Sequence, residues 1–137
     1  MQNLEQIRSA AAMAAADTKE GKKFLFIRSD VAGFPALIIT NGLLASMAYA
    51  NEGGDSRKGL KAACEFTSRH LANPLHGITV LEDVTTIRGA LDKLGRAPAT
   101  SSDLQRATSE ALAFFGYLKR FAVKTQPSAN AVQAGEE

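Results

Sequence analysis

The chain has no tryptophan, two tyrosines, four prolines and one cysteine among its 137 residues. A single cysteine, Cys64, excludes an internal disulfide framework and a zinc site built from cysteines. Few aromatic residues and abundant alanine favour closely packed helices over a β-sandwich. No apolar run approaches the roughly 18 residues of a membrane-spanning helix, and the first twenty residues lack the pattern of a signal peptide. We therefore expect a cytoplasmic protein without membrane contact.

The chain is long enough to bury a core, and its net positive charge is concentrated before residue 125. With 137 residues, 45% of them hydrophobic, it suits one globular domain. The net charge is +2, from 16 basic and 14 acidic side chains. Two of the acidic residues, Glu136 and Glu137, follow the last basic one, Lys124, so residues 1–124 hold 16 basic against 12 acidic side chains, or +4. We expect a single helical domain over 1–124 and a disordered tail over 125–137.

Hydrophobic periodicity predicts an all-α fold, a compact bundle of about five to six helices. Capping boxes are predicted at Thr79 with Glu82 and at Ser102 with Gln105, and Ser56 is the expected cap of an earlier helix. The segment before Gly33 is the least regular. A helix ending near residue 32 is favoured there, and a short strand over KFLFIR is the alternative. The other expected helices cover residues 3–17, 35–50, 56–71, 79–94 and 102–124.

Residues 34–50, FPALIITNGLLASMAYA, carry conflicting signals. Asn41-Gly42 between two apolar runs is typical of a β-hairpin. Pro35, however, suits the first turn of a helix, and a lone hairpin among helices has little to pair with. We expect a helix over 35–50, kinked at Gly42. An interior glycine costs about 1 kcal/mol relative to alanine, so helix packing or a close backbone approach is expected to favour it.

The chain contains no H-E-x-x-H, Walker loop, G-x-S-x-G or G-x-G-x-x-G motif. His70 and His76 have no cysteine or acidic residue nearby at the spacing of a metal motif, and His70 is expected to contact carbonyls or solvent. Glu82-Asp83 lies in the first turn of an expected helix, where the dipole favours negative charge. We expect no catalytic residue, no metal, no cofactor and no enzymatic activity.

Three stretches resemble a known family. NLEQIRSAAA near the start, FPALIITNGLLASMAYA, and TSEALAFFGYLKRFA near the end occur in the order and with the separation seen in the small subunit of the Cmr complex, the type III-B CRISPR effector that targets RNA. Tyr117 stands where that family usually has tryptophan, Ile39 where it often has a polar or basic residue, and Leu44 where it often has glycine. The resemblance covers nearly the whole chain before the expected tail.

The resemblance implies a non-catalytic subunit in antiviral defence. Its partners would be guide and target RNA, the backbone and large subunits, and further copies of itself stacked as a filament beside the backbone. Thr40, Asn41, Gly42 and Leu43 would form a subunit-contact or packing motif. From charge and motif position, the candidate RNA contacts are Arg8, Lys22, Lys23, Arg28, Lys61, Lys119, Arg120 and Lys124, with Arg120 and Lys124 one helical turn apart.

The alternative is a helical adaptor that binds only protein. Its interface would be an exposed apolar stripe of Ile38, Ile39 and Leu44, and its basic residues would be merely solvated.

Overall fold

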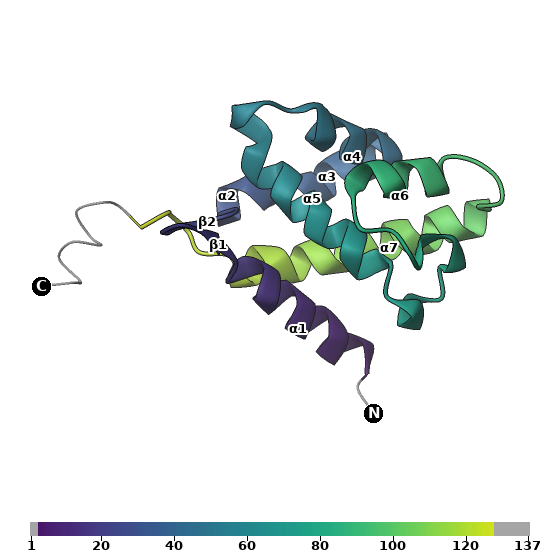
Figure 1. The fold of residues 1–137 in the computed structure, drawn as a ribbon, viewed down its shortest axis with the longest axis horizontal. Helices are drawn as coiled ribbons and strands as arrows, with labels where there is room; N and C mark the ends of the chain where they lie inside the picture. Colours follow the sequence, from purple (N-terminus) through teal and green to yellow (C-terminus); the bar gives the residue numbers. More distant parts are fainter. Residues whose placement is uncertain (1–2, 128–137) are drawn as a thin grey trace, which may run out of the picture.

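The structure, a computed structural model, describes residues 3–127. Within that range the chain forms seven α-helices, six of them eight residues or longer, and one two-stranded hairpin, so the predicted all-α bundle is confirmed. None of the described helices is long and apolar enough to span a membrane. The elements are α1 Leu4–Ala16, β1 Lys19–Glu20, β2 Lys23–Phe24, α2 Arg28–Val31, α3 Phe34–Asn41, α4 Leu43–Glu52, η1 Asp55–Arg57, α5 Lys58–Leu71, η2 Pro74–His76, η3 Thr79–Leu81, α6 Ile87–Leu94 and α7 Ser101–Phe121 (Figure 1).

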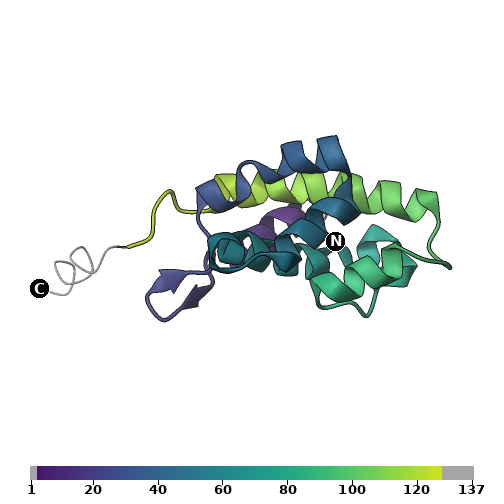
Figure 2. The ribbon, with the colours of Figure 1, turned by 90° about the horizontal axis from the view of Figure 1, so that it is seen from above.

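The 21-residue helix α7 forms the centre of the bundle. Helices α1, α2, α3 and α5 pack against it, and in the view from above α3 lies along one side of α7, with α6 and the hairpin on the other (Figure 2). The buried face of α7 includes Phe114, Phe115 and Leu118, each at most 1% exposed. The ring of Phe115 lies 4.7 Å from that of Phe34, which begins α3. The core is thus organised around the longest of the described helices.

Residues 19–32 do not form the helix that was favoured. β1 and β2 pair antiparallel, and Gly21 makes the turn between them at φ 66°, a conformation that glycine adopts without steric cost. The side chain of Gln126 accepts the N–H of Phe24 at 2.8 Å and donates to its carbonyl at 2.7 Å, so a distant residue completes this edge. Of the alternative strand over KFLFIR, only the first two residues are confirmed, as β2. Of the favoured helix, only the last turn forms, as α2. It ends at Val31, close to the expected end near residue 32.

Gln126 belongs to the segment 125–137 that was predicted as a tail. Its side chain is hydrogen-bonded to β2, as described above, whereas residues 128–137 lie outside the described part of the chain.

The stretch around Gly42 is helical, as predicted, but the helix is broken rather than kinked. Gly42 separates α3 from α4 with φ 88° and ψ 160°, a region of backbone space restricted essentially to glycine. A Cβ atom at this position would meet no atom within 4 Å, so neither tight packing nor close approach explains the residue. Its N–H still donates to the carbonyl of Ile38 at 2.7 Å, and its carbonyl accepts from Ser46 at 3.1 Å. Gly42 changes the direction of the chain while its own backbone groups stay bonded.

The predicted capping box at residue 79 is wrong. Residues 79–81 form the short turn η3, and α6 begins only after Thr86, whose hydroxyl accepts the N–H of Gly89 at 3.0 Å. The intervening turn lets both Leu81 and Ile87 become fully buried. Tertiary packing therefore overrides the local signal.

Two other helix starts are displaced by a short distance. The cap of α7 is Thr100, two residues before the predicted Ser102, because Thr100 and Asp103 form the capping box with reciprocal bonds of 3.2 and 2.9 Å. A carboxylate accepts such bonds more strongly than the amide oxygen of Gln105. Ser56, the expected cap of α5, lies inside η1 instead.

Candidate functional site

A groove between α7 and the α2–α3 segment gathers three of the predicted RNA contacts. Arg28, Lys119 and Arg120 all line this hollow of about 730 Å³. Its remaining lining is small or apolar and comes from the α2–α3 segment and from α7. Those lining residues are Ala32, Pro35, Ala36, Ile39, Leu112, Phe115 and Gly116.

The helix ends place positive charge at this groove. Lys119 and Arg120 lie in the last turn of α7, where the helix dipole favours cations. Nη2 of Arg28 donates to the carbonyl of Ala122 at 3.3 Å, while its Nε is buried and has no hydrogen-bond partner within residues 3–127. None of the described residues lining the groove is acidic. The arrangement offers three positive charges to an anion.

The other five predicted contacts lie outside the groove. Lys124 lies beyond the end of α7 at Phe121, so the prediction that Arg120 and Lys124 lie one helical turn apart is wrong. Lys23 lines a different hollow together with Glu20 and Asp30, which offset its charge. Of the five, Lys22 and Lys23 lie on the hairpin, Lys61 on α5, Lys124 beyond α7 and Arg8 on α1.

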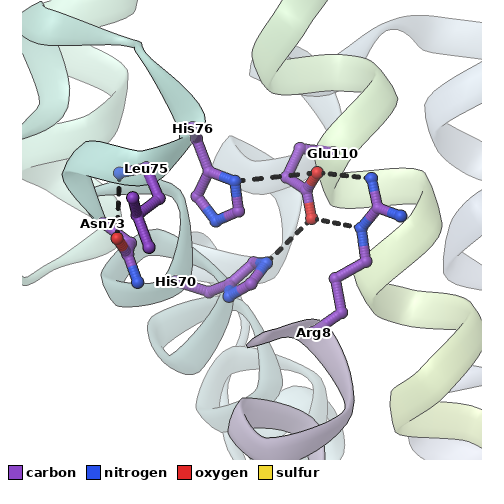
Figure 3. A network of polar contacts seen from close by, with 6 residues as sticks. All are labelled: Arg8, His70, Asn73, Leu75, His76 and Glu110. Carbon is purple, nitrogen blue, oxygen red and sulfur yellow. Dashed lines mark hydrogen bonds and ion pairs between the residues drawn. The ribbon is translucent and has the colours of Figure 1, made fainter. Parts of the chain in front are cut away.

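Arg8 takes part in a polar network inside the bundle (Figure 3). Its Nε and Nη2 donate to Oε2 and Oε1 of Glu110 on α7, both at 2.7 Å, which is the strong two-pronged geometry of an arginine–carboxylate pair. The Glu110 side chain is 6% exposed and that of Arg8 24%. The pair ties the first helix to the last across 102 positions of sequence.

Two histidines complete the network. Nε2 of His70, at the end of α5, lies 2.9 Å from Oε2 of Glu110, and Nδ1 of His76, in η2, lies 3.7 Å from Oε1. Each imidazole is 2% exposed, and the ring of His70 stacks on Phe114 with centroids 4.1 Å apart. The expectation that His70 contacts carbonyls or solvent is therefore wrong, because a buried carboxylate is its partner.

The charges in this network depend on one another. Burial alone would raise the pKa of Glu110, but hydrogen bonds from His70 and Arg8 outweigh it and lower the pKa to about 2. Burial lowers the pKa of the His76 imidazole, and the nearby His70 adds to this effect. Near neutral pH, Glu110 is thus an ionised acceptor, so Nε2 of His70 carries the hydrogen of their bond.

Sequence reasoning missed the network because its members are far apart along the chain. One signal was present nevertheless. Glu110 lies on the buried face of α7 among Ala107, Ala111 and Phe114, and a carboxylate on an apolar stripe needs a partner. The pattern predicts that Glu110 is paired, but it does not say with which residue.

A comparison of the sequence with models of known protein families shows which family the chain belongs to. The model of the CRISPR-associated protein family Cas_Cmr5 matches residues 4–125, from the start of α1 to the residue before Gln126. The chain belongs to this family. Cas_Cmr5 proteins are the small subunit of the type III-B Cmr complex and are generally non-catalytic, so the resemblance found in the sequence is confirmed. No curated protein and no solved structure matches the chain.

In this member of the Cas_Cmr5 family, the T-N-G-L motif is divided between surface and core. Leu43 is 2% exposed, whereas Thr40, Asn41 and Gly42 are exposed. Gly42 and Leu43 line a hollow of about 510 Å³ against the first half of α7. The motif therefore both anchors α4 and presents a polar corner at the surface.

The apolar stripe expected for a protein adaptor is not continuous. Ile38 is 2% exposed and belongs to the core, and Leu44 is partly buried. Ile39 alone projects, with 75% of its surface exposed. It stands at the edge of the basic groove.

Proposed function

We propose that this subunit helps to hold guide and target RNA in the type III-B effector through the groove between α7 and the α2–α3 segment, without catalysing a reaction. The supporting observation is that Arg28, Lys119 and Arg120 converge on one groove whose described lining has no acidic residue. Cations on rigid helices suit backbone phosphates, which position a nucleic acid without reading its sequence. Base pairing with the guide would supply the specificity.

The other predicted contacts have secondary roles in this proposal. Lys22, Lys61 and Lys124 add positive charge outside the groove, whereas the charge of Lys23 is offset by Glu20 and Asp30. Arg8 is the least suited of the eight, because both oxygens of Glu110 hold its guanidinium.

Assembly is the second part of the proposal. The subunit would act in the cytoplasm, contacting the backbone and large subunits and stacking with further copies of itself beside the backbone. Thr40 and Asn41, exposed at the break between α3 and α4, are the candidate subunit contacts. A break held by one glycine presents these polar side chains on rigid helix ends.

Charge reversal in the groove tests RNA binding. The Lys119→Glu, Arg120→Glu double variant is assembled with guide-loaded backbone subunits, and target-RNA affinity is measured across a salt titration. We expect weaker binding and a shallower dependence of log K on log salt, by about 0.7 for each single-strand phosphate that the variant no longer neutralises. The matched control is Arg88→Glu with Lys93→Glu on α6, which makes the same charge change outside the groove. Equal affinity and equal slope in the two double variants would contradict the proposal.

The exposed Ile39 supports the protein-only adaptor as a second candidate, since a side chain 75% exposed can enter a partner's pocket. A pull-down with backbone subunits, with and without guide RNA, separates the two functions. Retention that is independent of RNA, abolished in Ile39→Ser and unchanged in the groove double variant, would favour the adaptor.

A further inference from the structure

The buried network also has the composition of a metal site. The ligand atoms of His70, His76 and Glu110 all lie within 4.8 Å of one another, and all three residues are buried. Two imidazoles and one carboxylate are the protein ligands of one class of open zinc site. We propose that this pocket binds a divalent transition metal of the zinc class, and that Arg8 takes the place of that cation in the metal-free chain (Figure 3).

The distances are close to those that tetrahedral coordination needs. Bonds of about 2.05 Å place neighbouring ligand atoms about 3.3 Å apart. Nε2 of His70 lies 2.9 Å from Oε2 of Glu110 and Nδ1 of His76 lies 3.7 Å from Oε1, so the two imidazoles face different oxygens of the carboxylate. Side-chain rotations that place one carboxylate oxygen between the two rings would complete the coordination, with the Nε2 hydrogen of His70 moved to Nδ1, because a ligating imidazole nitrogen must be unprotonated.

The His76 ring makes no hydrogen bond to the described residues through Nε2, the nitrogen on the side away from Glu110. Its Nε2 is buried and has no hydrogen-bond partner among the described residues. The ring therefore breaks no hydrogen bond at Nε2 when it turns toward an ion. A buried polar atom without a partner is also unfavourable, so the present ring position has little to hold it.

Arg8 controls access to the pocket. It is the most exposed member of the network and comes from a separate helix. Its guanidinium now neutralises Glu110, and a dication beside it would be repelled. Metal and Arg8 therefore compete for the same carboxylate.

The ligand set selects the class of ion. Nitrogen ligands suit zinc, cobalt, nickel and copper, whereas magnesium and calcium prefer oxygen. With three protein ligands, the fourth position is open to water. Such an ion would join the end of α5, η2 and the middle of α7, independently of any RNA contact.

Titration of the untagged, chelator-treated full chain with Zn²⁺ tests the inference, using calorimetry and NMR of the imidazoles. The chain has only two histidines, and both lie in this pocket, so their resonances report on this site alone. We expect one equivalent of Zn²⁺ to bind, shift both imidazoles and raise the melting temperature. His76→Ala should weaken binding at least about tenfold.

The direction in which Arg8→Ala changes zinc affinity tests whether Arg8 and the metal compete for Glu110. Removal of the competing cation should tighten zinc binding by about tenfold, whereas Arg88→Ala, an exposed control on α6, should leave it unchanged. No saturable binding by either wild type or Arg8→Ala overturns the proposal. Weaker binding by Arg8→Ala, or unchanged binding by His76→Ala, overturns it as well.

Discussion

Gly42 is the residue whose backbone conformation sets the course of the chain from α3 to α4. With φ 88° and ψ 160° it occupies a region that other residues enter only under strain. We expect Gly42→Ala to lower the free energy of unfolding by about 1–3 kcal/mol, measured by urea denaturation.

Gly116 offers the matched control for that substitution. It lies in α7, and a Cβ atom there would meet nothing within 4 Å. Gly116→Ala should therefore raise stability by up to about 1 kcal/mol. Destabilisation of similar size in both variants would show that the conformation of Gly42 is not the cause.

Glu110 and His76 should make stability depend on pH. Folding lowers the pKa of Glu110 from 4.5 to about 2 and lowers that of His76 from 6.5. The unfolded chain then binds more protons than the folded chain, so the free energy of unfolding falls as pH falls. The His76 contribution is lost on going below about 6.5, and that of Glu110 between 4.5 and about 2.

Urea midpoints measured from neutral to acid pH check this dependence. Glu110→Gln should be less stable at neutral pH, because Arg8 loses its carboxylate, and should show a flatter profile in the lower window. Glu82→Gln, which removes an exposed carboxylate outside the network, is the control. A Glu110→Gln profile parallel to wild type would rule out this role of Glu110.

At the scale of elements, the start of α6 depends on one hydroxyl. Thr86 caps the helix by accepting the N–H of Gly89, so we expect Thr86→Ala to cost about 1 kcal/mol of stability. Thr79 is the control, because it was the predicted cap and lies instead in η3. If Thr79→Ala cost as much as Thr86→Ala in chemical denaturation, the capping assignment would fail.

The first helix was predicted well from local signals, although the local capping signal at Thr79 was misleading. α1 follows its capping residue Asn3 and its run of alanines, of which Ala12, Ala15 and Ala16 are buried. The hairpin could not be predicted in the same way, because the hydrogen bonds that Gln126 makes with Phe24 span 102 positions. A local pattern cannot contain a partner so far away.

At the scale of the whole molecule, hydrogen bonds join the first part of the described chain to its last part. Arg8 pairs with Glu110, the Arg28 N–H donates to the carbonyl of Val123 at 2.8 Å, and β2 bonds Gln126. We therefore expect a single cooperative unfolding transition, which also tests the prediction of one domain over residues 1–124.

The two tyrosines make this test specific, because the chain has no tryptophan. Tyr49 lies on α4 and Tyr117 on α7. Tyr49→Phe and Tyr117→Phe each leave one fluorescent reporter, and both reporters should unfold at the midpoint given by far-UV circular dichroism. Separate midpoints would divide the chain into two folding units.

The sequence by itself determined the helical class, the helical conformation around residues 35–50 and the family, because propensity, periodicity and ordered motifs are properties of neighbouring residues. The eight candidate RNA contacts chosen from the sequence include the three cations that share a groove, but the sequence did not distinguish these three from the other five. Only the tertiary structure decided which of the eight converge, that Glu110 binds Arg8 and His70, and where the hairpin forms. Those outcomes depend on contacts between distant segments, which exist only after the chain has packed.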